Sequence, residues 1–184
     1  MIRRLLMTVL LALPGLTLAS DWQIQHDNSR LGFVGTQSGA EFKGEFERFE
    51  ADMRFDSDAL DASGFDVRID VTSFNSRSSD RDSTVSGKDW FWFSRFPEAR
   101  YTTTSIRRTG PDQYEADGQL TIRDKTHDVR LPFRWVIDGD TATMVGQTTL
   151  LRTRFDVGTG EWRSGKTVGL QVDVLVDLTL KTKE

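Results

Sequence analysis

The stretch TVGLQVDVLVDLTLK, Thr167–Lys181, has an apolar residue at every second position. Because successive side chains of a β-strand point to opposite faces, the pattern predicts one long strand that is apolar on one face and polar on the other. Its apolar face consists of Val168, Leu170, Val172, Val174, Val176, Leu178 and Leu180. These side chains could pack against one another as a core or line a cavity that holds a ligand, and the pattern leaves both open.

Shorter alternating runs, such as GFDVRIDVTSF, QYEADGQLTIRD and DVRLPFRWVID, recur along the chain between Asp, Gly and Asn residues. The sequences DGDTA after Ile137 and RDKTH, Arg123–His127, predict tight turns between strands. Many strands that are apolar on one face predict an all-β protein, either an antiparallel sandwich or a closed barrel. The chain length suits an eight-stranded antiparallel barrel, which can be filled by side chains or hold one ligand.

One segment, RDSTVSGKDWFWFSRFPEARY, Arg81–Tyr101, breaks the alternation. Its first part predicts a short helix with Asp80 or Asp82 as N-cap, ending near Gly87. Five aromatic residues follow within a few positions: Trp90, Phe91, Trp92, Phe93 and Phe96. We expect this aromatic segment to lie near one end of the barrel, where it either plugs that end or rims an opening.

The N-terminus has the layout of a secretory signal peptide. Arg3 and Arg4 precede an apolar run, Leu5–Leu18, that is shorter than the roughly 20 residues needed to span a bilayer. Thr17 and Ala19 form a small-x-small cleavage site, so we expect residues 1–19 to be removed and residues 20–184 to form one domain. The chain has no cysteine, which excludes disulfides, thiolate metal sites and a lipid anchor on cysteine. The predicted location is the periplasm.

The charge balance of the chain argues against partners with an anionic surface. Without Arg3 and Arg4, the 24 Lys and Arg fall to 22, against 28 Asp and Glu. An acidic chain that lacks a basic cluster is a poor partner for a phosphate backbone or an anionic membrane. We therefore expect neither nucleic-acid binding nor stable membrane insertion.

The sequence gives weak support to catalysis or metal binding. His26 and His127 are the only histidines, and no serine lies in a Gly-x-Ser-x-Gly elbow. Most acidic residues of the strands fall on the polar face, where they keep a sheet soluble; examples are Asp66, Asp70, Asp173 and Asp177. We expect no catalytic residue, no metal and no cofactor.

The order of several motifs resembles the YceI-like family, periplasmic lipocalin-like proteins that bind polyisoprenoids and related lipids. The motifs are WQIQHDNSRLGF, FKGEFERFEADMRFD, RDSTVSGKDWF with RFPEARY, GQLTIRDKTHDVRLPF and LLRTRFDVG. The chain departs from the family pattern at Asn28, where histidine is common, at Leu151 in place of Asn, and at Asp124 and Asp156 in place of Gly.

The resemblance implies an eight-stranded antiparallel lipocalin-like barrel, formed by residues 20–184, whose hydrophobic lumen binds a ligand. The implied ligand is an amphipathic polyisoprenoid, an isoprenoid quinone or another long-chain isoprenoid or acyl lipid, carried through the periplasm or serving a stress response. The hypothesised lumen lining is Phe46, Phe55, Val71, Trp90, Phe91, Phe133, Trp135, Phe155, Leu170, Val172 and Val174. Arg152, carried over from the last motif, is the candidate for head-group contact. Its alternative is a structural pair with an acid such as Asp82.

A second hypothesis is a filled barrel that acts as an interaction module and docks a membrane or periplasmic partner. A third, a hydrolase or isomerase acting on such lipids, lacks a visible catalytic group. The expected oligomeric state is a monomer or a homodimer.

Overall fold

A computed structural model describes residues 19–183 of the chain. Residues 1–18, which hold most of the expected signal peptide, lie outside this range. The strands are β1 Ser20–Ile24, β2 Arg30–Gln37, β3 Ala40–Phe46, β4 Phe49–Phe55, β5 Gly64–Asp70, β6 Phe74–Asn75, β7 Glu98–Gly110, β8 Gln113–Ile122, β9 Lys125–Asp138, β10 Thr141–Leu151 and β11 Gln171–Thr182. The helix is α1 Ser79–Val85, and the 3-10 turns are η1 His26–Asn28, η2 Leu60–Ala62, η3 Val71–Ser73, η4 Arg152–Phe155 and η5 Gly160–Ser164.

The strands form a closed antiparallel barrel, which confirms the predicted fold class. Neighbours around the barrel are β1, β4, β5, β7, β8, β9, β10 and β11, and a β1–β11 pairing closes the ring. Along β11, Leu180 pairs with Ile24 of β1 and Val176 pairs with Leu31 of β2. The strands β1 and β2 therefore pair with successive parts of the same edge of β11. The strand β3 pairs with β2 and extends the wall upward.

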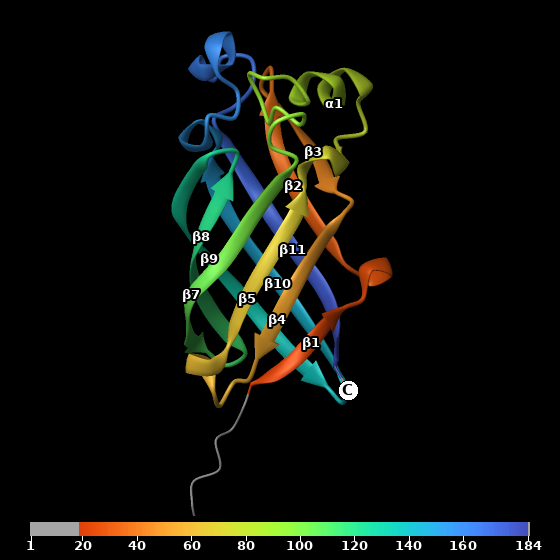
Figure 1. Ribbon diagram of the computed structural model, residues 1–184, viewed down its shortest axis with the longest axis vertical. Helices are drawn as coiled ribbons and strands as arrows, with labels where there is room; N and C mark the ends of the chain where they lie inside the picture. Colours follow the sequence, from red (N-terminus) through yellow and green to blue (C-terminus); the bar gives the residue numbers. More distant parts are fainter. Residues whose placement is uncertain (1–18, 184) are drawn as a thin grey trace, which may run out of the picture.

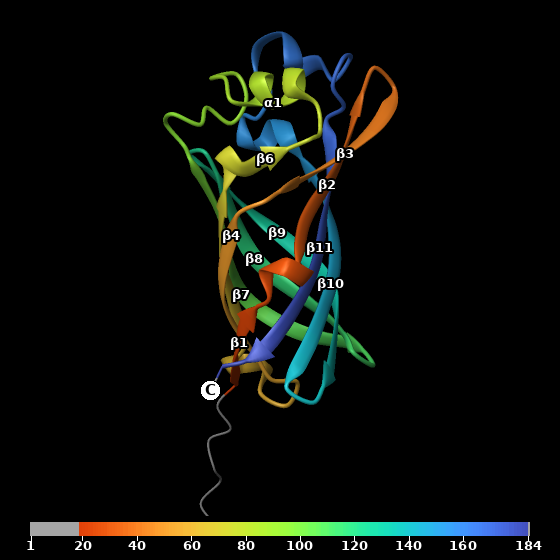
Figure 2. The ribbon, with the colours of Figure 1, turned by 90° about the vertical axis from the view of Figure 1, so that its right-hand side faces the viewer.

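The barrel has two different ends (Figures 1 and 2). At the upper end lie α1, the aromatic segment, the tip of the β2–β3 hairpin and the loop that carries η4 and η5. At the lower end β1 begins and β11 ends. The aromatic segment therefore lies near one end, as predicted.

Two of the local predictions need correction. The helix begins at Ser79 after Ser78 as N-cap, so the expected N-cap of Asp80 or Asp82 is wrong. The carboxylate of Asp82 instead accepts hydrogen bonds from the backbone N–H of Ser76 at 2.9 Å and from its hydroxyl at 2.6 Å, and so braces the turn before the helix. The long strand begins at Gln171 rather than at Thr167, because the preceding loop carries η5 and a left-handed Gly165.

Both predicted turns exist. The DGDTA turn joins β9 to β10 with Asp138 paired to Thr141, and Gly139 adopts the positive φ of 63° that suits a glycine. The second turn is tighter than predicted, since only Arg123 and Asp124 lie outside the strands.

The lower half of the barrel is a packed aromatic core. The ring centroids of Phe55 and Trp135 lie 4.5 Å apart, and those of Trp22 and Trp135 lie 5.4 Å apart. The indole N–H of Trp22 donates to the carbonyl of Phe55 at 3.0 Å, so this buried donor is satisfied. Phe65 and Phe133 complete the layer, with ring centroids 5.6 Å apart. This layer forms a solid floor beneath the upper half.

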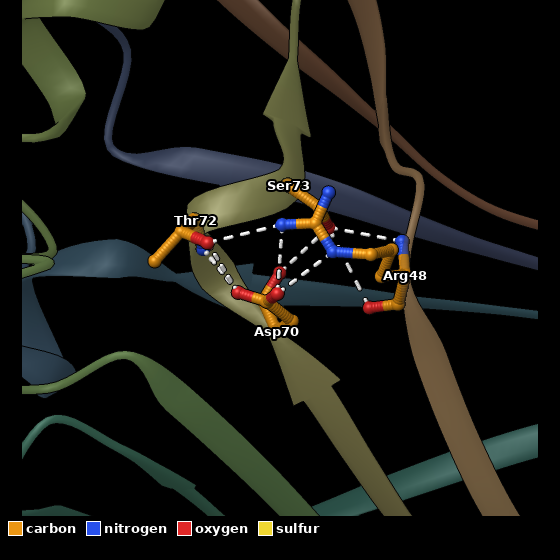
Figure 3. A network of polar contacts seen from close by, with 4 residues as sticks. All are labelled: Arg48, Asp70, Thr72 and Ser73. Atoms are coloured by element: carbon orange, nitrogen blue, oxygen red, sulfur yellow. Dashed lines mark hydrogen bonds and ion pairs between the residues drawn. The ribbon is translucent and has the colours of Figure 1, made fainter.

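A polar network fixes the corner where two neighbouring strands bend (Figure 3). Arg48, between β3 and β4, donates from Nε to the Asp70 carboxylate at 2.9 Å and from Nη2 to the Thr72 hydroxyl at 3.2 Å. Its backbone N–H donates to the Ser73 hydroxyl at 3.0 Å. Beyond this corner the full β4–β5 pairing gives way to a short β3–β6 pairing of two residues, Glu45 with Asn75 and Phe46 with Phe74.

The network predicts a pH-dependent contribution to stability. Partial burial raises the pKa of Asp70, but hydrogen bonds from Thr72 and Arg48 outweigh it and hold the pKa below its usual value. A lowered pKa in the folded state means that the stabilisation is present above the unfolded value of about 3.9 and is lost as the pH falls through the folded value. We expect Asp70→Asn to lower the free energy of unfolding at pH 7 by less than about 1 kcal/mol, because the pair is partly exposed.

Urea unfolding of both proteins between pH 7 and pH 2 checks this prediction. The difference between wild type and Asp70→Asn should shrink toward zero at the acid end. The exposed Glu41 of β3 offers the control Glu41→Gln. A difference for Asp70→Asn that stays constant over the whole range contradicts the prediction.

Candidate functional site

Above the aromatic floor the barrel is hollow. The cavity has a volume of about 510 Å³, which lies in the range of small-molecule binding pockets. Its wall is largely apolar and comes from most of the strands. Val174 and Val176 of β11 and Ala51, Val67 and Ile69 of β4 and β5 face it, yet they are only partly buried, in contrast to the floor residues. Inward-facing side chains that remain accessible are the mark of an unfilled lumen.

This geometry answers the question raised by the alternating stretch. Val168, Val172, Val174, Val176 and Leu178 line the cavity. Leu180, at the lower end of the same face, is fully buried in the packed core. One apolar face therefore serves as cavity wall in its upper part and as core in its lower part.

The hypothesised lining residues separate into two groups. Seven of them line the cavity: Phe46, Val71, Trp90, Phe91, Phe155, Val172 and Val174. Four do not: Phe55, Phe133, Trp135 and Leu170.

The placement of these four needs correction, for two reasons. Phe55, Phe133 and Trp135 belong to the floor, where aromatic rings from several strands fill the full width of the barrel. Leu170 lies just before β11, outside regular strand geometry, so the alternation does not reach it. It packs over Gly165, where an added Cβ would lie 2.8 Å from the Leu170 Cγ.

The roof of the cavity is a second, smaller core. Val85 of α1 and Trp90 pack with Tyr101, Phe155 and Val157. Trp90 and Phe91 face the cavity from above. The aromatic segment thus covers the upper end and also contributes to the cavity wall.

Arg152 is buried in this roof, with 4% of its surface exposed. Its Nε donates to the carbonyl of Gly169 at 2.8 Å. Its Nη1 donates to Val157 at 2.8 Å and Gly158 at 3.0 Å, and its Nη2 donates to Trp162 at 2.6 Å and Val168 at 2.8 Å. A guanidinium has five N–H groups, and all five are occupied by backbone carbonyls. Arg152 therefore ties the ends of the η4–η5 loop together.

The alternative pairing of Arg152 with Asp82 is wrong, since its partners are carbonyls and Asp82 binds Ser76. Burial lowers the pKa of Arg152 below its ordinary value. Its guanidinium carbon lies 5.0 Å from the Trp90 ring centroid, which offers the cation an aromatic face. Gly158, with φ of 80°, makes room for it: an added Cβ would lie 1.9 Å from Nη1.

The polar part of the lining gathers where the barrel wall is incomplete. Past the short β3–β6 pairing, the chain leaves the wall and enters α1. The tip of the β2–β3 hairpin and the start of α1 lie on the two sides of this gap, where Arg81 contacts Gln37 and Phe42. Gln37 and Phe42 line the cavity from the hairpin, and Ser78, Asp80, Arg81 and Thr84 line it from the helix side. We call this region the mouth.

The comparisons with known proteins agree with this architecture. The sequence profile of the YceI-like domain matches residues 22–180. The chain belongs to the YceI-like family. A UPF0312 protein of Vibrio parahaemolyticus is 26% identical over 160 residues, which are 82% of this chain and 85% of the relative. Protein YceI of Escherichia coli O157:H7 is 29% identical over 97 residues, which are 53% of this chain and 50% of the relative.

Solved structures of YceI-like proteins share the barrel. The crystal structure of Burkholderia cenocepacia BcnA matches with a TM-score of 0.82 and 30% identity, over 85% of this chain and 98% of that chain. A polyisoprenoid binding domain from Saccharophagus degradans, implicated in plant cell wall breakdown, matches with a TM-score of 0.71 over 89% of this chain and 99% of that domain. At 11% identity, this match shows a common fold alone.

Several residues that line the cavity, among them Gln37, Phe42 and Arg81 of the mouth, lie outside the hypothesised lining. Arg81 was quoted within a family motif but was not assigned to the lumen, because its position at the start of a helix does not reveal which way its side chain points. Within residues 19–183, no group of three or more His, Asp or Glu side chains is placed to hold a metal ion. The helices in that part of the chain are all too short or too polar to cross a membrane.

Proposed function

We propose that this protein binds the apolar chain of an amphipathic polyisoprenoid, an isoprenoid quinone or another long-chain lipid in the barrel lumen. The observation that carries the proposal is the cavity of about 510 Å³, with an apolar wall, a closed aromatic floor and a polar mouth. Burial of a hydrocarbon chain contributes about 0.8 kcal/mol per methylene and makes no directional demand, so such a lumen suits a long flexible chain. The S. degradans domain of the same fold, which binds polyisoprenoid by its description, supports this choice of ligand.

The proposed setting is the periplasm, with residues 1–19 removed as a signal peptide and residues 20–184 forming the binding domain. In that compartment the barrel would carry or sequester a lipid that water does not dissolve. The proposal is one of binding without chemical conversion. N-terminal sequencing of the protein recovered from the periplasm should begin at Ser20, and recovery of the uncleaved chain in membranes contradicts the proposed location.

Native mass spectrometry of the exported protein, followed by organic extraction, tests the binding proposal. We expect a discrete additional mass that is lost on extraction and is recovered in the organic phase as an isoprenoid or acyl lipid. A protein that is recovered without added mass, and that takes up neither added quinone nor added prenol, contradicts the proposal. That outcome favours the alternative of an interaction module that acts through its outer surface.

A further inference from the structure

The mouth of the cavity holds a cation whose hydrogen-bonding capacity is only partly used. Arg81, in the first turn of α1, is partly buried and lies on the cavity wall. Its guanidinium carbon lies 4.5 Å from the ring centroid of Phe42, on the opposite side of the mouth. The side chain therefore spans the gap between helix and hairpin.

Three of the five N–H groups of Arg81 have partners among residues 19–183. Nε donates to the Ser76 hydroxyl at 3.1 Å, and Nη2 donates to the Ser76 carbonyl at 3.1 Å. Nη1 donates to Oε1 of Gln37 at 3.2 Å. One N–H on each terminal nitrogen is left without a protein acceptor in this part of the chain. Arg152 differs, because all five of its N–H groups are occupied.

Arg81 has no direct ion-pair partner within the described residues, although Asp80 lines the same cavity and the Ser76 hydroxyl, which accepts from Arg81, donates to Asp82. No carboxylate oxygen of residues 19–183 lies within 4.0 Å of its guanidinium. The neighbouring Asp82 directs its carboxylate to Ser76 instead. A partly buried cation next to an apolar lumen gains most from a partner that brings a negative charge and accepting oxygens together.

We propose that Arg81 binds the head group of the lumen ligand, and that this head group presents anionic oxygens, as a phosphate or a carboxylate does. The inference rests on the proposed function, which places the apolar chain below the mouth. The two free N–H groups provide a two-point contact for such a group, whereas a hydroxyl offers a single neutral acceptor. Gln37 and Ser76 hold the guanidinium in place by their contacts with the other three N–H groups.

The test compares three probes that share one chain: geranylgeranyl phosphate, geranylgeranoic acid and geranylgeraniol. Isothermal titration of each into the full mature protein measures the dissociation constant. A hydrogen bond to a charged group makes a net contribution of roughly 1.5 kcal/mol, which corresponds to about tenfold in affinity. We expect at least one anionic probe to bind about tenfold more tightly than the alcohol. The ranking of phosphate against carboxylate identifies the class of head group.

Arg81→Met should remove this advantage, so that the anionic probes and geranylgeraniol bind to the variant with dissociation constants within about threefold of one another. Arg81→Lys keeps the positive charge but lacks the paired N–H donors of the guanidinium, so this variant should keep part of the preference for the anionic probes. Arg77→Met removes an exposed cation nearby that does not line the cavity, so the advantage should persist in that control. The test compares the affinities of probes that differ only in the head group. A variant that merely disturbs the structure of the mouth would weaken all three probes alike and would leave their ratio unchanged.

The inference is overturned if the wild-type protein binds all three probes equally, or if Arg81→Met preserves the preference for anions. If none of the three probes binds to the wild-type protein, the proposed function itself fails and the inference with it. Equal binding of all three, in contrast, leaves the proposed function intact and removes only the role of Arg81.

Discussion

Val174→Trp is expected to abolish the uptake of a long-chain lipid. Val174 is the fourth residue of β11 and lines the cavity, where it lies beside Thr148 of β10 and Phe33 of β2 on the two neighbouring strands. The larger indole would occupy space that the ligand chain needs. Displacing about four methylenes, at about 0.8 kcal/mol each, lowers the affinity by about 3 kcal/mol, which is more than a hundredfold.

The same strand offers a matched control. Leu175, the next residue, points to the outer face and does not line the cavity, so Leu175→Trp should bind lipid as the wild-type protein does. Titration with geranylgeraniol measures both variants. Unchanged binding by Val174→Trp, in a variant whose thermal unfolding shows that it folds, contradicts a lumen site and directs the search to the outer surface.

Arg152→Met is expected to cause the largest loss of stability. Methionine fills much of the same space but leaves five backbone carbonyls without their donor. Each buried acceptor that loses its partner costs about 1–3 kcal/mol, although water reaches some of them. We expect a loss on the order of 4 kcal/mol in the free energy of unfolding, or roughly 10 °C in Tm.

Arg154→Met is the control for this prediction, because Arg154 lies in the same 3-10 turn but is exposed. It should change the free energy of unfolding by less than about 0.5 kcal/mol. Thermal unfolding by circular dichroism compares the two variants. Equal and small effects from both would show that the carbonyl contacts of Arg152 do not hold the loop.

Two arginines at the upper end therefore have different expected effects. Arg152 is enclosed, and its N–H groups are all engaged by the backbone. Arg81 lies at the mouth, and two of its N–H groups have no acceptor in the described part of the chain. The sequence offered Arg152 for head-group contact because a family motif contains it. The structure shows that its donors are already in use, whereas two N–H groups of Arg81 have no protein acceptor among residues 19–183.

The fold could be predicted from the sequence because its signals are local. Alternation along Gly64–Asp70, Gln113–Ile122 and Lys125–Asp138 identifies strands with one apolar face, and the turn residues mark where the chain reverses. Strands of this kind form either a sandwich or a closed barrel, and the order of motifs, which resembles the YceI-like family, implied the barrel. The exact start of the helix could not be predicted, because Asp82 is used by Ser76 rather than by the helix N-terminus.

The sequence by itself thus determined the strands and which of their faces turn inward, since side-chain alternation is a property of neighbouring residues, and the family resemblance implied the closed barrel. Only the tertiary structure decided where the barrel is solid and where it is hollow. The floor is made by Trp22, Phe55 and Trp135, which come from distant strands and meet in one layer, while Val174 is only partly buried and lines the cavity. Whether a side chain fills a barrel depends on the residues it faces across the lumen, and alternation along one strand does not contain that information.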